Sequence, residues 1–335
     1  APKPGGYRDS GADIAFALRQ AGVTVVTPEQ WPDPAVDDGW TFPDTAVGIA
    51  AAVQAGATTL WANTVLFSGH PLEQILGRVR IVGQIPAVVD RYDDKAVMNQ
   101  ELADAGVPVV RHVLLAESPT SRSKLSLDAL DAACLAHEGL TFPLVVKPIR
   151  GRGSAGVTVV DSLTTLRTTV AATIASGHFG STLMVEPYLP GDEVTITVMP
   201  PDRFRTSAPA RHWCLPPVRR VNHHDGVAPY NGTVAVVHNS EVLSAAEQAD
   251  PTVLELLDAC RTVAEYIDAR APIRIDCRQD TDGVFRVFDV NLKPNMTGPG
   301  RPGRDDQLSL TGMAAAAVGM SYTDLLTTML AAAWA

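Results

Sequence analysis

Hydrophobic residues recur at helical spacing and in short extended runs along the first 89 residues. Apolar side chains three or four positions apart predict amphipathic helices, whereas runs of β-branched and apolar residues predict strands. Alternation of the two is typical of a small α/β domain with a mainly parallel sheet. The pattern predicts helices at 10–22, 44–56 and 71–76, strands at 23–26 and 58–63, a polar loop at 27–43 and an apolar run at 81–89.

Two further units follow, so the predicted domains are 1–89, 90–185 and 186–335. Asp93 or Asp94 is placed to cap a helix that runs to Ala105 and ends at a glycine. Two long irregular segments, at 200–232 and 295–306, are typical of functional loops. The other predicted elements are helices at 126–138, 162–176, 251–269, 307–318 and 321–331, and strands at 107–115, 142–149, 156–161, 181–189, 192–199 and 233–238.

Residues 272–297 contain two alternating apolar runs around a DTDG turn, which predicts a β-hairpin. With those four turn residues as the loop, Arg274 faces Asp289. Residues opposed across the pair, and residues two apart on one strand, share a face. Arg274, Asp276, Asp289 and Asn291 should therefore point to one side, where carboxylate and amide oxygens suit Mg²⁺. Taken alone, the pattern fits a solvent-exposed polar face equally well.

Composition narrows the classes of function. The chain has 335 residues, 46% of them hydrophobic, and a formal net charge of −10. A chain this acidic lacks the basic footprint that binding to nucleic acid requires, so any anionic ligand must be held by a few placed cations.

The cysteines and the hydropathy pattern indicate a cytoplasmic protein. The four cysteines are scattered without the spacing of a zinc site or a disulfide framework, which indicates reduced thiols. The sequence shows no signal peptide and no apolar run of about 18 residues that would span a membrane.

A lysine and a glycine-rich loop follow one predicted strand in the segment PLVVKPIRGRGSAGV, residues 143–157. Glycines allow backbone N–H groups to approach phosphate oxygens, and a lysine at the strand end adds a point charge. The spacing is neither that of a P-loop nor that of a dinucleotide fingerprint. The segment therefore predicts a flap between two strands, with Lys147, Gly151, Gly153, Ser154 and Gly156 as phosphate-binding candidates. A tight polar turn is the alternative.

The segment 183–194 places Glu186 at the end of an apolar strand and Glu193 seven residues later. These carboxylates could accept hydrogen bonds from hydroxyl or amino groups, and the backbone of Tyr188 and Leu189 could pair with a purine edge. Lys95 begins a predicted helix. An exposed linker and a surface lysine explain these residues as well when each is taken alone.

In this order, the segments resemble the ATP-grasp superfamily, and within it the D-alanine–D-alanine ligase-like group. The similarity covers residues 80–330 and rests on an ordered set of motifs, which is more specific than any single one. The matching motifs are Asp94-Lys95, Val146-Lys147-Pro148 with GRGSAG, Glu186 to Glu193, Arg274-Ile-Asp276, and Asp289-Val-Asn291 with Pro294, Met296 and Thr297.

The resemblance implies a three-domain ATP-grasp fold, α/β overall and α+β in its ATP-binding half, with an N-terminal parallel-sheet domain. It implies that Lys95, Lys147 and the glycine-rich loop hold the phosphates of ATP. Glu186 and the backbone of the next residues would meet adenine, and Glu193 the ribose. Asp276, Asp289 and Asn291 would hold two Mg²⁺ ions, with Mn²⁺ as an alternative, and Arg274 would stabilise the transferred phosphoryl group.

The sequence departs from the family pattern at several positions. Asp289 stands where a glutamate is usual, and Asn295 where a glycine is usual. The expected lysine of the 200–232 segment is absent, which leaves Arg211, Arg219 or Arg220 as replacements. An insertion at 298–306 carries Arg301 and Arg304, which we predict to grip a substrate carboxylate bidentately.

The sequence therefore predicts an ATP-dependent ligase that joins a small-molecule carboxylate to an amine through an acylphosphate and releases ADP and phosphate. Amino acids or specialised metabolites are the expected substrates, and a homodimer is common among such ligases. A ligase with a different acceptor and a catalytically silent nucleotide-binding protein are the alternatives.

Overall fold

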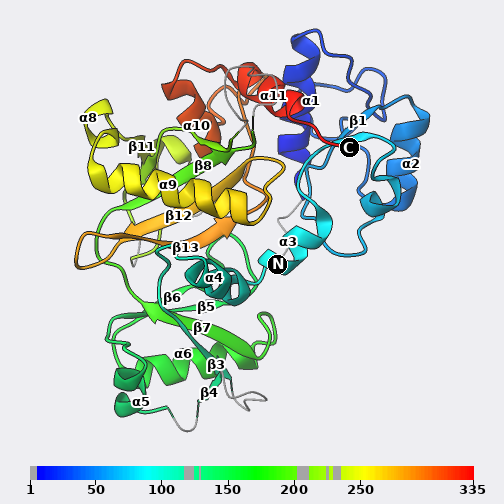
Figure 1. The fold of residues 1–335 in the computed structure, drawn as a ribbon. Helices are drawn as coiled ribbons and strands as arrows, with labels where there is room; N and C mark the ends of the chain where they lie inside the picture. The colour runs from blue at the N-terminus through cyan, green and yellow to red at the C-terminus, as the bar shows by residue number, and fades with distance from the viewer. Residues whose placement is uncertain (1–5, 117–123, 128–129, 202–210, 224–225, 229–234) are drawn as a thin grey trace.

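The computed structural model describes residues 6–116, 124–127, 130–201, 211–223, 226–228 and 235–335. The described residues form three sheets, with helices packed on them (Figure 1). Within these ranges, no helix is both long and apolar enough to cross a membrane.

The N-terminal part has a two-stranded parallel sheet, in which β1 pairs with β2. Trp334, near the other end of the chain, adds an antiparallel bridge to Ile81 of β2. The predicted strand at 23–26 is wrong, because Val23 donates its N–H to α1 and the Val25 carbonyl accepts from Arg19 of α1. The elements are α1 Arg8–Gln20, α2 Ala46–Gln54, β1 Thr59–Trp61, the 3-10 helix η1 Pro71–Ile75, β2 Arg80–Val82 and α3 Pro86–Tyr92.

The second sheet has the strand order β4-β3-β7-β5-β6, and α5 and α6 bury their apolar sides against one core with it. The predicted helix at 126–138 begins later than expected, because Asp131 caps α5 by accepting from the Cys134 N–H, at 2.7 Å. The elements are α4 Lys95–Asp104, β3 Val113–Ala116, β4 Lys124–Ser126, α5 Ala132–His137, β5 Leu144–Pro148, β6 Thr158–Val160, α6 Leu163–Ala175 and β7 Thr182–Pro187.

The third sheet has the order β11-β10-β8-β12-β13, with β9 also paired to β8. α9 lies across one face of this sheet (Figure 1). The predicted strand at 233–238 is wrong where it is described, because a short helix precedes β11. The elements are β8 Glu193–Met199, β9 Trp213–Cys214, β10 Val218–Arg220, α7 Val236–Asn239, β11 Ser240–Val242, α8 Ala245–Gln248, α9 Pro251–Tyr266, β12 Ile273–Gln279, β13 Phe285–Asn291, α10 Leu310–Ala317 and α11 Tyr322–Ala331.

Alternation along β8 separates a dry face from a polar face. Val194, Ile196 and Val198 join the core under α9, whereas Glu193 and Thr195 line the opposite side. Successive side chains of a strand point to opposite faces, so one strand contributes both to the core and to a polar cleft.

The β12–β13 hairpin forms, but its register differs from the predicted one. Arg274 pairs with Asn291 and Asp276 with Asp289, and the register shifts after Asp276. Cys277 pairs with Val287, which leaves Phe288 as an extra residue in a β-bulge. Because of the bulge, Val287 turns into the core while the polar residues of β13 keep the face that they share with β12.

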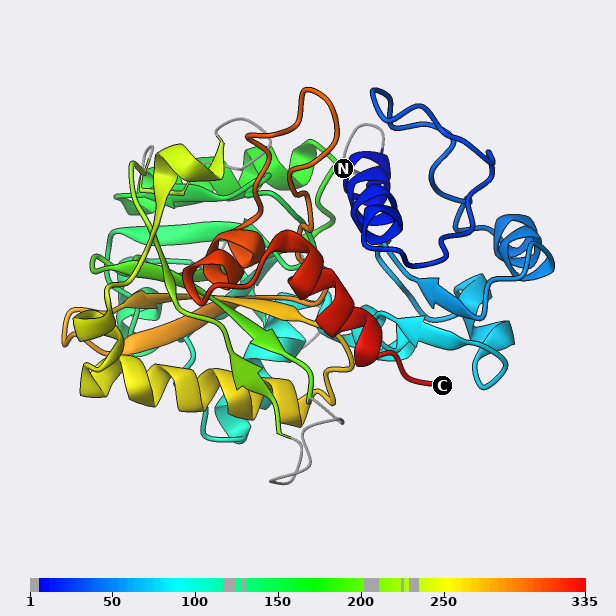
Figure 2. The ribbon, with the colours of Figure 1, turned by 90° about the horizontal axis from the view of Figure 1, so that it is seen from above.

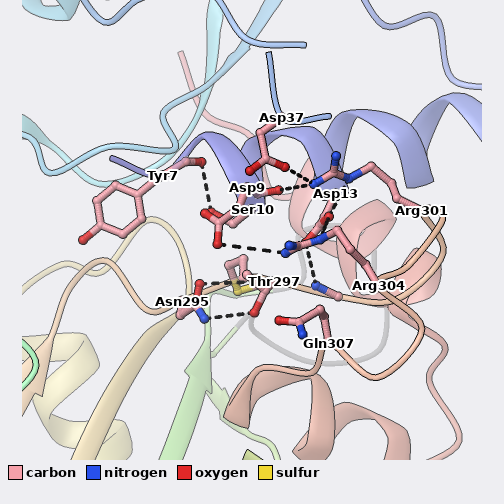
Figure 3. A network of polar contacts seen from close by, with 12 residues as sticks. Tyr7, Asp9, Ser10, Asp13, Asp37, Asn295, Thr297, Arg301, Arg304 and Gln307 are labelled. Carbon is pink, nitrogen blue, oxygen red and sulfur yellow. Dashed lines mark hydrogen bonds and ion pairs between the residues drawn. The ribbon is translucent and has the colours of Figure 1, made fainter. Parts of the chain in front are cut away.

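The N-terminal part is joined to the 298–307 loop through a buried carboxylate. Figure 2 shows α1 beside this loop, and Figure 3 shows the contacts. Asp13 of α1 is buried and accepts from Arg301 Nε at 2.7 Å, from Arg304 Nε at 2.8 Å and from the Gly298 N–H at 3.3 Å. Breaking a buried charge pair by removing one partner is strongly destabilising, because the other charge stays desolvated.

We predict that Asp13→Asn lowers the free energy of unfolding by about 3 kcal/mol, since two guanidinium groups lose their buried partner. Urea denaturation followed by circular dichroism measures this change. Asp38→Asn is the matched control, because Asp38 pairs with Arg8 on the surface and should contribute less than about 1 kcal/mol. Equal losses in the two variants would contradict the buried role of Asp13.

Candidate active site

A cleft of about 230 Å³ lies between the two larger sheets. Seven cationic and four anionic side chains line it, although the whole chain is acidic. The cleft therefore concentrates positive charge where a polyanion would bind. Of the predicted site residues, the structure brings together Lys95, Lys147, Gly151, Gly153, Ser154, Glu186, Tyr188, Leu189, Glu193, Arg220, Arg274, Asp276, Asp289 and Asn291.

The hairpin places two carboxylates and an amide side by side. Asn291 Nδ2 lies 3.0 Å from Asp276 Oδ2 and 3.4 Å from Asp289 Oδ2. Arg274 donates to both oxygens of Asp276, at 3.1 and 2.9 Å, and the Thr195 hydroxyl donates to Asp276 at 2.7 Å. Within the described residues, no group of three or more His, Cys, Asp or Glu could hold a metal. A cation here would need the Asn291 amide as its third ligand.

Two lysines each pair with a carboxylate of the cleft. Lys147 is buried and donates to Glu186 Oε1 at 2.7 Å and to the Phe288 carbonyl at 2.9 Å. Lys95 Nζ lies 3.3 Å from Asp289 Oδ1 and donates to the Gly151 carbonyl at 3.1 Å. The Phe288 carbonyl comes from the bulge residue, so the irregularity of β13 helps to place Lys147.

The carboxylates of the cleft differ in their proton affinity. Burial raises the pKa of Glu186 above its ordinary value, and the nearby Lys147 cation offsets only part of this. Burial also acts on Asp289, but Lys95, Lys147 and Arg274 outweigh it and hold the pKa of Asp289 below its ordinary value. Asp289 therefore stays ionised, as a ligand of a cation must be.

The glycine-rich loop crosses the cleft between β5 and β6. Gly153 and Ser154 have φ of 65° and 58°, in the left-handed region that a glycine adopts without strain. Arg152 of this loop pairs with Asp93 beside the start of α4. Gly156 is not among the lining residues, and a side chain there would meet Pro148 at 2.9 Å.

The segment after β7 lies at one end of the cleft. The Tyr188 N–H donates to the Pro143 carbonyl at 3.0 Å, so it is already used within the protein. The Tyr188 carbonyl and the Leu189 backbone remain for pairing with a purine edge. Glu193 accepts from His223 Nε2, with 2.8 Å between the two atoms, whereas the neighbouring position 224 lies outside the described residues.

The structure does not bring three of the predicted substrate arginines to the cleft. Arg219 donates to Asp192, Glu241 and Glu247 on the surface. All five N–H donors of Arg301 bind protein acceptors of the N-terminal part, among them Asp13 at 2.7 Å and Asp37 at 2.5 Å. Arg304 donates two hydrogen bonds to Asp13. The prediction that Arg301 and Arg304 grip a substrate carboxylate is therefore wrong.

Arg220 is the predicted substrate arginine that does reach the cleft, where it is buried. Burial lowers the pKa of Arg220 below its ordinary value, although Asp276 and Glu193 favour its charged form. The positive charge of Arg220 therefore balances the negative charges of these two carboxylates in the cleft.

Sequence reasoning missed several residues that line the cleft. Arg278 donates to the Tyr188 hydroxyl at 2.8 Å and to the Gly226 carbonyl at 2.9 Å, and lies 3.5 Å from Glu193. Its position two residues after Asp276 on the same strand was the feature of the sequence that could have predicted Arg278 as a lining residue. Tyr7, whose ring lies 3.9 Å from Lys293 Nζ, comes from the N-terminal part and gave no such signal.

The facing sheets and the cleft between them have the arrangement of ATP-grasp ligases. Residues 102–331 match the family described as the D-ala D-ala ligase C-terminus. Because the match covers more than half of the chain, this protein belongs to that family. The resemblance inferred from the motifs is confirmed.

Relatives support the assignment at moderate identity. A D-alanine--D-alanine ligase of Psychrobacter sp. (strain PRwf-1) is 31% identical over 186 residues, which are 56% of this chain and 49% of that protein. D-alanine--D-alanine ligase B of Pseudomonas putida is 28% identical over 242 residues, 71% of this chain and 63% of that protein. The chain thus spans about half to just under two thirds of these relatives.

Solved structures share the fold. The D-alanine--D-alanine ligase of Bacillus anthracis complexed with ATP aligns with a TM-score of 0.59 and 18% identity over 86% of this chain and 82% of that one. The VanG D-Ala:D-Ser ligase of Enterococcus faecalis aligns with a TM-score of 0.58 and 16% identity, over 82% and 72% of the two chains. Likeness at these identities establishes the fold.

A half-buried histidine near the cleft should make stability depend on pH. Burial, followed by the Lys147 cation, lowers the pKa of His112 to about 4. The Nδ1–H of the neutral ring donates to Asn99 Oδ1 at 3.0 Å, because Asn99 Nδ2 is used by the Val110 carbonyl. As the pH falls from about 6.5 toward 4, His112 becomes protonated in the unfolded chain but stays neutral in the folded chain. The free energy of unfolding therefore falls.

We predict that His112→Gln loses less stability than the wild type between pH 7.5 and pH 5, because the variant lacks this group. Urea midpoints at the two pH values measure the difference. His137→Gln, at an exposed histidine, is the control. The same pH slope in His112→Gln and the wild type would contradict the assignment.

Proposed function

We propose that this protein is an ATP-dependent ligase that joins a small-molecule carboxylate to an amine. The observation that carries the proposal is the cleft itself: Asp276, Asp289 and Asn291 converge beside Lys95 and Lys147 in a cation-rich space between two sheets. Family membership and the shared fold support the same reaction class. We retain the division into domains at 1–89, 90–185 and 186–335 as part of the proposal.

The reaction would proceed in two steps in which the protein mainly orients and neutralises charge. A carboxylate oxygen of the acid attacks the γ-phosphorus of ATP, and the bond to the β-phosphate oxygen breaks to release ADP. The amine nitrogen then attacks the acyl carbon, phosphate leaves, and the amine loses a proton. In this proposal Lys95 and Lys147 bind the phosphate oxygens and Arg274 stabilises the transferred phosphoryl group.

The donor set fits a divalent cation. Both carboxylates lie within reach of one amide nitrogen, so their oxygens converge on a small space. The nitrogen and oxygen of an amide exchange places by a flip, which would turn the Asn291 oxygen into the same space. Hard oxygen ligands of this kind suit Mg²⁺, which would neutralise phosphate charge during transfer, and Mn²⁺ accepts the same ligands.

The end of the cleft near β7 fits a purine. Within the described residues, Glu186 Oε2 is buried and has no hydrogen-bond partner, although Oε1 of the same carboxylate is bound by Lys147. A buried acceptor without a donor is costly. The exocyclic amine of adenine would supply that donor, with the Leu189 backbone beside it and Glu193 placed for the ribose hydroxyls.

We predict that Asp289→Asn lowers the turnover of ATP about 100-fold or more, because the variant loses the charge that faces Lys95 and the cation. ADP release in the presence of an acid and amine panel measures the change. Asp258→Asn, at an exposed position of α9, should leave turnover unchanged. Wild-type protein that binds Mg-ATP without turning over any acid would favour the catalytically silent alternative.

We also predict that chelation by EDTA abolishes ADP release and that added Mg²⁺ or Mn²⁺ restores it. Oxygen ligands bind both ions, whereas Zn²⁺ prefers nitrogen and sulfur ligands. Protein fluorescence during titration with Mg²⁺ and an ATP analogue that is not hydrolysed gives a second readout. Full activity in EDTA would contradict the cation site.

A further inference from the structure

One of the lining cations, Arg152 of the glycine-rich loop, has its counter-charge outside the cleft. Four other lining cations pair with carboxylates that also line the cleft: Lys95, Lys147, Arg274 and Arg278. Arg152 pairs instead with Asp93, which does not line it. In the described part of the chain, Nε and Nη1 of Arg152 have no hydrogen-bond partner, so the guanidinium group retains N–H donors for a ligand.

The glycine-rich loop is anchored beside the proposed cation ligands. The Gly151 carbonyl accepts from Lys95 Nζ at 3.1 Å, and the same Nζ lies 3.3 Å from Asp289 Oδ1. One ammonium group thus joins the residue before Arg152 to a proposed cation ligand. Because metal ions bridge the β- and γ-phosphates during phosphoryl transfer, the γ-phosphoryl group would lie at this end of the cleft, next to Arg152.

The backbone of the loop holds Arg152 at the start of a tight turn. The Ala155 N–H donates to the Arg152 carbonyl at 3.3 Å, and the two residues between them have positive φ. This is the left-handed backbone that tight turns adopt at both central positions. The turn residues Gly153 and Ser154 are exposed, whereas Arg152 is half-buried. A change of partner therefore requires rotation of the Arg152 side chain rather than movement of the loop.

The pair between Arg152 and Asp93 can be exchanged at little cost. The two side chains are partly exposed, and such ion pairs contribute little to stability. Arg150 Nη1 lies 3.8 Å from the other carboxylate oxygen of Asp93, so Asp93 keeps a counter-charge when Arg152 leaves it. A phosphoryl group offers a guanidinium group several charged oxygens in the geometry of a bidentate pair, which makes it the stronger partner.

We propose that Arg152 is a catalytic residue that leaves Asp93 when Mg-ATP binds and donates hydrogen bonds to oxygens of the γ-phosphoryl group. The inference rests on the proposed ligase function. A guanidinium group at this place stabilises the charge on the phosphoryl oxygens while the bond to ADP breaks and the bond to the carboxylate forms. Arg152 forms no covalent bond and loses no proton in this step.

Nucleotide binding tests the contact without knowledge of the natural substrates. The full chain with Mg²⁺ is titrated by calorimetry with ADP and with AMP-PNP, a triphosphate analogue that is not hydrolysed at its terminal bond. Arg152→Met should weaken AMP-PNP binding at least about tenfold, the scale of one hydrogen bond to a charged group, and leave the Kd for ADP nearly unchanged. Unchanged ADP binding also shows that the variant is folded.

Two matched variants separate a phosphate contact from a latch that only holds the loop. Arg150→Met removes an equal charge from the same loop, but Arg150 does not line the cleft, so AMP-PNP binding should be unchanged. Asp93→Asn breaks the pair with Arg152 and should leave AMP-PNP binding equal or tighter, because Arg152 is released toward the phosphates. A loss of AMP-PNP affinity in Asp93→Asn as large as that in Arg152→Met would show a latch and overturn the proposal.

Turnover gives a second readout. In ADP release with the acid and amine panel, Arg152→Met should lower kcat about 100-fold. Arg152→Lys, which keeps the charge but loses the bidentate geometry, should fall between the wild type and Arg152→Met.

The outcomes separate this inference from the proposed function. Equal effects of Arg152→Met on ADP and AMP-PNP binding, or an unchanged kcat, overturn the role of Arg152 and leave the ligase function standing. If the wild type binds neither nucleotide, the ligase function fails, and the inference falls with it.

Discussion

Pairing of opposite charges inside the cleft is the interaction on which the rest of this structure depends. Removing a charge from water costs several kcal/mol unless a partner compensates it. Here Lys147 pairs with Glu186, Arg274 with Asp276 and Lys95 with Asp289, so each of these buried or half-buried groups has a protein counter-charge. A bound nucleotide and cation would exchange these partners rather than create new charges in the cleft.

Much of the cleft could be predicted because its residues lie in short segments whose geometry is local. The shared face of the hairpin depends only on alternation, and Asp276, Asp289 and Asn291 lie together although the predicted register was wrong. The extra residue, Phe288, could not be predicted from the same pattern, since an apolar residue in a bulge looks like any other in a strand. Its carbonyl nevertheless receives the Lys147 ammonium.

Contacts between distant parts of the chain could not be predicted. The arginines of the insertion suggested a carboxylate partner, and they have one, but the carboxylate belongs to Asp13, 288 residues before Arg301. Sequence alone does not distinguish a guanidinium that binds a substrate from one that joins two parts of the fold. The same limit applies to Tyr7 and Lys293, and to the 23–26 segment, whose polar groups are used by α1.

The bridge between Ile81 and Trp334 also has a consequence for synthesis of the protein. Two hydrogen bonds join these residues, at 2.6 and 3.0 Å, and the Trp334 indole donates to the Gly83 carbonyl at 2.7 Å. During synthesis, the small N-terminal sheet leaves the ribosome early. The edge of β2 that Trp334 covers then stays exposed until some 250 further residues have been made. Closure of such a large loop is slow, and an exposed strand edge invites association during the delay. Nascent chains stalled before residue 334 should therefore be the species that most needs chaperone protection.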